Sequence, residues 1–237
     1  MKTRHHHIFK KNPEYYRVLI LRTLGNFLIF GSLFMMAKTL YLPVKEELVY
    51  RLDKVRAKEY VVQGSDYDSL PVQKKGLLGG LFDSASVERI VPADTDYGIV
   101  IPKIAANARV LPNVNAADEN EYLNALNSGV AHAAGTAFPG QQGHIYLFAH
   151  STDYFWNVGS YNAVFYLLYK LEQDDEIDLF YDGQKYVYKV ESKKIVDPSE
   201  VEYLTRQTSS EVLTLQTCWP PGTTLKRLLV FARRAAE

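Results

Sequence analysis

The segment Leu213-Thr214-Leu215-Gln216-Thr217-Cys218-Trp219-Pro220-Pro221-Gly222 is a short alternating apolar run that ends at a strong turn signal. It contains the only cysteine of the chain, and Pro-Pro-Gly follows one residue later. Side chains alternate between the two faces of a strand, so the cysteine falls on the face away from the leucines. The pattern therefore predicts a strand that carries a thiol to the mouth of a loop.

Two further segments place polar residues on a comparable face. A single free cysteine can be an inert, buried apolar residue, so the strand alone does not establish catalysis. The run 144–151 alternates in the same way and ends with His150 on the face away from its apolar residues. The run 225–232 places Arg227 on the face away from its apolar residues. We therefore expect Cys218, His150 and Arg227 to share one surface.

This ordered set of motifs resembles the sortases, the membrane-anchored cysteine transpeptidases of bacterial surfaces. The resemblance extends over 97–233 and departs from many sortases at His144, where they carry Asn. It rests on these motifs: Ala149-His150-Ser151, Thr214-Leu215-Gln216-Thr217-Cys218, Arg227-Leu228-Leu229-Val230, Ile101-Pro102-Lys103-Ile104 and Gly135-Thr136-Ala137-Phe138-Pro139-Gly140.

The chemistry of these three side chains fits acyl transfer. A thiol reacts as the thiolate and needs a base, which His150 can supply, and the acyl intermediate needs a donor for its oxyanion, which Arg227 can supply. A protonated His150 can then donate its proton to the departing amine. Ser151 and Thr217 flank two of these residues and are weaker candidates for substrate binding, because such hydroxyls can also bond to neighbouring backbone.

The resemblance implies the reaction and the partners. Cys218 would cleave an LPXTG-like sorting motif of a surface protein and form a thioacyl intermediate. An amine of cell-wall precursor or of a pilin-like subunit would then resolve this thioester, whereas water would make the enzyme a thiol protease. A membrane-tethered β-barrel binding module without turnover is the alternative. A papain-like hydrolase fits less well, because its cysteine precedes its histidine in the chain.

The second half of the sequence is rich in strand patterns. Eight strands are predicted, at 97–104, 106–114, 131–137, 144–151, 176–181, 185–196, 211–218 and 225–233, with helical patches at 118–127, 160–171 and 199–207. Many short strands with few helices indicate a mainly β barrel or sandwich. The sortase resemblance selects a closed eight-stranded barrel.

The first half predicts a membrane anchor. Residues 1–17 form a basic cytoplasmic tail under the positive-inside rule, and 18–42 form an apolar span. Its uncharged centre, 23–37, is about 22 Å long as a helix, so the flanking Arg22 and Lys38 must extend their charged ends outward. No Ala-x-Ala-like cleavage site follows, which favours an uncleaved single-pass anchor over a signal peptide. The catalytic part would then lie outside the cell.

Residues 43–96 are predicted to be an extracytoplasmic spacer before a catalytic domain at 97–237. Within the spacer, 44–60 has the pattern of an amphipathic helix. The rest loses periodicity and contains a glycine-rich apolar patch at 76–82, which could graze the bilayer or cover the groove, although a mobile linker fits better.

Composition excludes some classes of function. Basic and acidic residues balance at 27 each, which gives no indication of nucleic-acid binding. A single cysteine cannot form an internal disulfide, although it could join two chains. No metal or other cofactor is predicted, since His144 and His150 lie about 20 Å apart along a strand. The acidic residues Asp197, Glu200 and Glu202 are better explained as helix caps than as calcium ligands.

Overall fold

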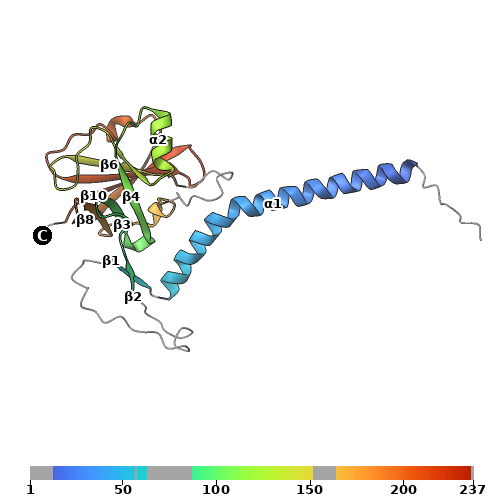
Figure 1. Ribbon diagram of the computed structural model, residues 1–237, viewed down its shortest axis with the longest axis horizontal. Helices are drawn as coiled ribbons and strands as arrows, with labels where there is room; N and C mark the ends of the chain where they lie inside the picture. Colours follow the sequence, from blue (N-terminus) through green and yellow to red (C-terminus); the bar gives the residue numbers. More distant parts are fainter. Residues whose placement is uncertain (1–12, 57, 63–86, 152–163, 236–237) are drawn as a thin grey trace, which may run out of the picture. The chain divides into compact units, whose positions relative to one another are not determined.

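The structure is a computed structural model, which describes residues 13–56, 58–62, 87–151 and 164–235 (Figure 1). It divides the chain into two compact units, Met1–Val44 and Lys45–Glu237. The division falls close to the predicted end of the anchor, whereas the predicted boundary between spacer and catalytic domain at residue 96 stays a prediction.

The first unit is dominated by helix α1 (Pro13–Val55), whose last residues belong to the second unit. Pro13 occupies the first helical position, where the missing N–H is not needed, and Glu14 lies in the first turn, near the positive end of the helix dipole. The part Pro13–Tyr41 has 29 residues and a mean hydropathy of 1.8, and none of its apolar stretch is buried inside the protein. At about 1.5 Å per residue it exceeds the ~30 Å hydrocarbon core, so it is long and apolar enough to cross a membrane.

The second unit contains a closed barrel of eight strands in the order β10-β8-β7-β3-β4-β5-β6-β9 (Figure 1). This confirms the predicted mainly β, eight-stranded barrel. Closure leaves no unpaired strand edge. The strands are β3 (Tyr97–Ile101), β4 (Ala106–Val114), β5 (Val130–Ala133), β6 (His144–Phe148), β7 (Glu176–Tyr181), β8 (Gln184–Val196), β9 (Val212–Trp219) and β10 (Lys226–Arg234).

Several predicted strands are shorter than expected. The first barrel strand ends at Ile101 because Pro102 has no N–H for the ladder and begins a 3₁₀ turn, η3 (Pro102–Ile104). The strand predicted at 131–137 ends at Ala133, whose carbonyl accepts the Thr136 N–H and closes a turn. The strand predicted at 144–151 ends at Phe148, although its backbone contacts continue to residue 149.

The helices of the second unit are short. Helix α2 (Glu119–Leu126) lies beside β4 and β5, and the Asp118 carboxylate caps it by accepting the Glu121 N–H at 3.1 Å. The patch predicted at 160–171 contains η4 (Leu168–Lys170), with its first part outside the described residues. The patch predicted at 199–207 contains only the 3₁₀ turn η5 (Val201–Tyr203).

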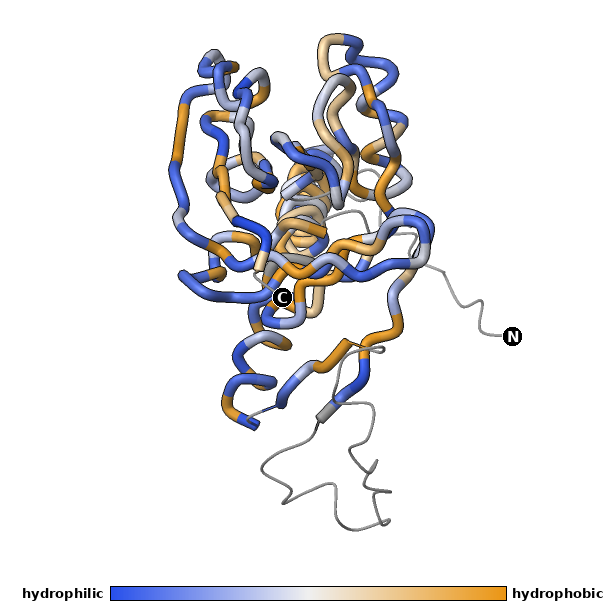
Figure 2. Tube along the Cα trace, turned by 90° about the vertical axis from the view of Figure 1, so that its left-hand side faces the viewer, coloured by the Kyte–Doolittle hydropathy of each residue, from blue (hydrophilic) through white to orange (hydrophobic). Residues whose placement is uncertain are grey.

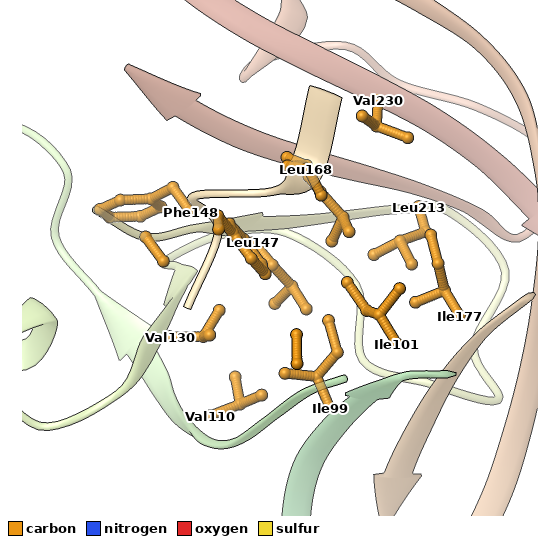
Figure 3. Packing of buried hydrophobic residues seen from close by; sticks show 14 of the residues in the cluster. Ile99, Ile101, Val110, Val130, Leu147, Phe148, Leu168, Ile177, Leu213 and Val230 are labelled. Carbon is orange, nitrogen blue, oxygen red and sulfur yellow. The ribbon is translucent and has the colours of Figure 1, made fainter. Parts of the chain in front are cut away.

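Side chains from alternate strand positions fill the interior of the barrel and form its core. Hydrophobic and hydrophilic stretches are interspersed along the chain (Figure 2). The first part of β4 alternates between buried and less buried residues, as expected where one face is buried, whereas every residue of β3, β5 and β6 is buried. Figure 3 shows the buried side chains of several strands converging, together with Leu168 of η4. The fully buried members include Ile99, Ile101, Ile145, Leu147, Leu168, Ile177, Leu179, Leu213, Leu215 and Val230.

Two short strands outside the barrel were not predicted. β1 (Glu59–Val62) and β2 (Val87–Ile90) pair in parallel. Val62 is buried in a second apolar cluster with Val100 and Phe180, and Ile90 packs against it. Strands of four residues give too little periodicity to be recognised, and β1 lies at the end of a pattern interpreted as helix. The glycine-rich patch at 76–82 lies outside the described residues.

A carboxyl group is buried in the wall of the barrel. Asp178 of β7 is fully buried, and the Lys185 Nζ lies 2.9 Å from its Oδ2. Burial raises the pKa of Asp178 to about 7. The charge of Lys185 lowers this pKa in part, whereas Glu176 raises it further. A carboxyl whose pKa is higher in the folded chain favours folding while protonated. Its ionisation therefore lowers stability as pH rises from the ordinary pKa of 3.8 towards about 7.

Asp178→Asn is expected to remove this pH dependence. The difference in free energy of unfolding between the variant and the unchanged chain should rise by about 2–3 kcal/mol from about pH 5 to about pH 8. Chemical denaturation of the detergent-solubilised chain at both pH values measures the difference. Asp96→Asn is the matched control, because Asp96 is exposed. Equal differences between variant and unchanged chain at the two pH values would contradict the prediction.

Candidate active site

Cys218 lies near the end of β9 as a free, half-buried thiol. It shares a face with Thr214 and Gln216, whereas Leu213 and Leu215 point into the core. The face of β9 that carries Cys218 is partly covered, because Leu229, on the same face of the neighbouring strand β10, is fully buried. Burial raises the pKa of the Cys218 thiol, and the charge of Arg227 lowers it only in part. The thiol is therefore predominantly protonated at neutral pH.

Arg227 is the direct antiparallel partner of Cys218 in the β9–β10 pair. Directly opposed residues place their Cβ atoms about 4.5–5.5 Å apart on the same face. The Arg227 Nη1 donates to the carbonyls of Thr224 and Lys226, each at 3.1 Å. The loop before β10 thus holds one edge of the guanidinium beside the strand that carries the thiol.

His150 follows β6, which runs parallel to β9 on its other side. The register pairs His144 with Val212 and Phe148 with Gln216, and the Ala149 N–H donates to the Gln216 carbonyl at 3.1 Å. His150 and Cys218 each lie two residues beyond this last registered pair, Phe148 and Gln216. Cys218 and Arg227 are thus direct partners on neighbouring strands, and His150 follows the end of β6, the strand on the other side of β9.

The two flanking hydroxyl residues are both buried. The Thr217 hydroxyl donates to the Ala149 carbonyl at 2.9 Å, and this bond ties β9 to the residue before His150. Thr217 thus satisfies neighbouring backbone, which was the alternative to substrate binding. Ser151 is 3% exposed, at the last described position before residue 164. A substrate-binding role for either residue stays a prediction.

Comparison with known proteins connects this arrangement to a family. A family model for the sortase domain matches residues 99–235, more than half of the chain. The chain belongs to the sortase family. The match includes Cys218, His150 and Arg227, and it covers nearly all of the barrel.

Individual sortases resemble this one over part of its length. Sortase D of Bacillus subtilis (strain 168) is 30% identical over 137 residues, 56% of this chain and 61% of that relative. Sortase C1 of GBS pilus island 1 has a TM-score of 0.50 and 27% identity, over 60% of this chain and 64% of that one. Sortase C-1 of Actinomyces oris has a TM-score of 0.50 and 28% identity, over 61% of this chain and 76% of that one. The match thus spans less than two thirds of the first two relatives.

This sortase also has a polar pair beside the site that the sequence analysis missed. The buried Tyr146 donates its hydroxyl to the Gln216 Oε1 at 2.6 Å. Burial raises the pKa of Tyr146, and the nearby charge of Arg227 lowers it in part. The pair thus lies on the face of Cys218 and close to Arg227. Both residues have the strand parity of the predicted site, but recognising them required the register between β6 and β9.

Other polar residues of this sortase are used elsewhere in the fold. His132 and His144 are buried, and burial lowers the pKa of each to about 4, so both are neutral. The His144 Nε2 bonds the Thr214 hydroxyl at 2.8 Å. Arg233 pairs with Glu191 at 3.4 Å, and the Arg234 guanidinium lies over the rings of Tyr186 and Tyr188, at 4.7 and 5.9 Å. Both arginines lie at the other end of β10 from Arg227.

The acidic connection between β8 and β9 is a segment in which no calcium site was predicted. Asp197 pairs with Lys226 at 2.6 Å, and the Glu200 carboxylate accepts the Asp197 N–H at 2.8 Å. Within the described residues, no group of three metal-binding side chains comes together. Independence from metals stays a prediction.

Proposed function

We propose that the chain is a cysteine transpeptidase of the sortase type. It cleaves an LPXTG-like sorting motif through a thioacyl intermediate on Cys218, and it transfers the acyl group to an amine. Membership of the sortase family supports a transpeptidase function in general. The observation that supports the detailed proposal is the direct pairing of Cys218 with Arg227, together with the parallel pairing of β9 with β6, which His150 follows.

The raised pKa of the thiol decides how the first step runs. Because Cys218 is protonated in the resting enzyme, a base must take its proton as the sulfur attacks the scissile carbonyl. His150 takes this proton, and the Arg227 guanidinium stabilises the oxyanion of the tetrahedral intermediate. When the intermediate collapses, His150 returns the proton to the departing amine, leaving a thioester on Cys218. An incoming amine then forms the new amide and releases the thiol.

The donor and acceptor follow from the family. The donor is a surface protein with a C-terminal sorting motif, and the acceptor is an amine of cell-wall precursor or of a pilin-like subunit. One structural relative is named for a pilus island, which supports the pilin class among the possible acceptors. When water replaces the amine, the same thioester is hydrolysed and the enzyme acts as a thiol protease.

The direct test offers the full chain in detergent a library of Leu-Pro-x-Thr-Gly and Leu-Ala-type peptides with assorted amines. We expect mass spectrometry to show a shortened peptide joined to an amine, formed only when Cys218 is present. A membrane-tethered binding module would retain peptides without cleaving them, and that result would overturn the proposal. Slow alkylation of the thiol does not distinguish the two, because burial also slows it.

The anchor sets the side of the membrane on which the reaction occurs. We propose that residues 1–17 are cytoplasmic and that the barrel lies outside the cell, because basic residues dominate the N-terminal flank. Protease added to intact cells stripped of wall is expected to digest the chain after Pro43. Protection of that part, together with digestion of residues before Arg17, would show the opposite orientation.

A further inference from the structure

The C-terminal part of α1 contacts the rest of the second unit through Glu47 and Tyr50. Lys45–Val55 belongs to the second compact unit. There the Glu47 Oε2 accepts a hydrogen bond from the Tyr169 hydroxyl at 3.0 Å, and its Oε1 accepts one from the Lys170 Nζ at 3.1 Å. Arg51, one turn further along α1, donates to the same oxygen at 2.8 Å. Three donors thus converge on Glu47, two of them from η4.

This contact is better built than an ordinary surface ion pair. The side chains of Glu47 and Lys170 are 22% and 23% exposed. The Lys170 ammonium also lies over the rings of Tyr50 and Tyr169, at 5.1 and 4.9 Å from their centroids. Burial by itself would raise the pKa of Glu47. The bonds from Arg51, Lys170 and Tyr169 nevertheless hold this pKa below its usual value. Glu47 is therefore ionised at neutral pH. Its carboxylate keeps the hydrogen bonds from the Arg51 and Lys170 cations and from the Tyr169 hydroxyl.

Tyr169 connects this contact to the strand of the thiol. Its ring packs against the Trp219 ring, with centroids 5.5 Å apart, and its carbonyl accepts the Lys193 Nζ at 2.7 Å. Trp219 is the last residue of β9, directly follows Cys218 and packs against the barrel core. A strand end that is held by a packed aromatic ring keeps its neighbouring side chain in one position.

We propose that Glu47 is a positioning residue for the active site. It fixes Tyr169, Tyr169 fixes Trp219, and Trp219 sets the place of Cys218 between His150 and Arg227. Helix α1, which contains the predicted membrane anchor, thus also supplies a residue that positions the active site. The inference rests on the proposed function for the role of Cys218 as nucleophile, but not for the contacts themselves.

The test uses alkylation of the full chain by iodoacetamide, because Cys218 is the only thiol and needs no substrate to react. Glu47→Ala and Tyr169→Phe are compared with the unchanged chain, and Tyr169→Phe keeps the ring that packs on Trp219. Each variant is expected to react roughly threefold to tenfold faster near neutral pH, with a pH profile shifted to lower pH. The reason is that a loosened strand end is less buried, which lowers the thiol pKa. Turnover of a cleavable peptide should fall through kcat, with little change in KM.

The design separates positioning from folding and from the proposed function. Glu59→Gln removes an exposed carboxylate of β1 and should leave both alkylation and turnover unchanged. The double variant should react no faster than the faster single variant, because both changes break one path. Alkylation rates equal to those of the unchanged chain, or effects that multiply in the double variant, would overturn the inference. If the unchanged chain cleaves no peptide, the proposed function fails while the alkylation result still decides the inference.

Discussion

Replacement of Cys218 by alanine is expected to abolish cleavage and transfer, with a loss of at least about 10⁴-fold in kcat/KM. The whole reaction passes through the Cys218 sulfur, and the chain has no second cysteine to replace it. Cys218→Ser is expected to be almost as inactive, because a serine hydroxyl gives up its proton far less readily than a thiol. Steady-state kinetics with a cleavable sorting-motif peptide measures both losses.

The controls for this prediction concern the fold. Cys218 is half-buried at a strand end, so serine should fit its place with little change in melting temperature. A folded serine variant without activity would show that the loss is chemical. Turnover above about a hundredth of the original in either folded variant would contradict the assignment of the nucleophile.

The second large effect is expected at Arg227. Arg227→Lys keeps a positive charge beside Cys218 but loses the planar fork of donors, so turnover should fall by about 10²-fold or more. Lysine offers one ammonium and cannot both bond the loop carbonyls that Arg227 now contacts and reach an oxyanion in the same geometry. Stability should scarcely move, because the core contacts of β10 come from Leu228 and Val230.

Arg233→Lys is the matched control on the same strand. Arg233 is an exposed arginine of β10 that pairs with Glu191, and lysine can form the same kind of pair. It should be nearly silent in kinetics and in stability. If Arg233→Lys is as damaging as Arg227→Lys, or if Arg227→Lys acts only by unfolding the chain, then the role of Arg227 is wrong.

Much of the barrel could be predicted because its signals are local. Alternation along each strand identifies a core face and a second face, and it assigns Cys218, His150 and Arg227 to the second face. Closure into a barrel came from the resemblance to sortases, since alternation alone also fits a sandwich. The shortened ends of β3 and β5 depend on the turn that Pro102 begins and on the turn that the Thr136 N–H closes.

The features that were missed depend on contacts between distant parts of the chain. Tyr146 and Gln216 are 70 residues apart and meet only through the parallel register of β6 and β9. Glu47 and Tyr169 are 122 residues apart, in segments that were interpreted as spacer and helical patch. The raised pKa of Cys218 likewise required knowing that the face opposite the core is itself partly covered, as at Leu229.

The central claim is that Cys218 carries the acyl group between donor and acceptor, and intact-mass spectrometry tests it most directly. The full chain is mixed with a cleavable sorting-motif peptide without an added amine and quenched in acid. We predict an added mass equal to the acyl fragment, located on Cys218 by peptide mapping and removed by hydroxylamine, as a thioester should be. Cleavage of the peptide with no adduct at Cys218, or with an adduct on another residue, would contradict the mechanism.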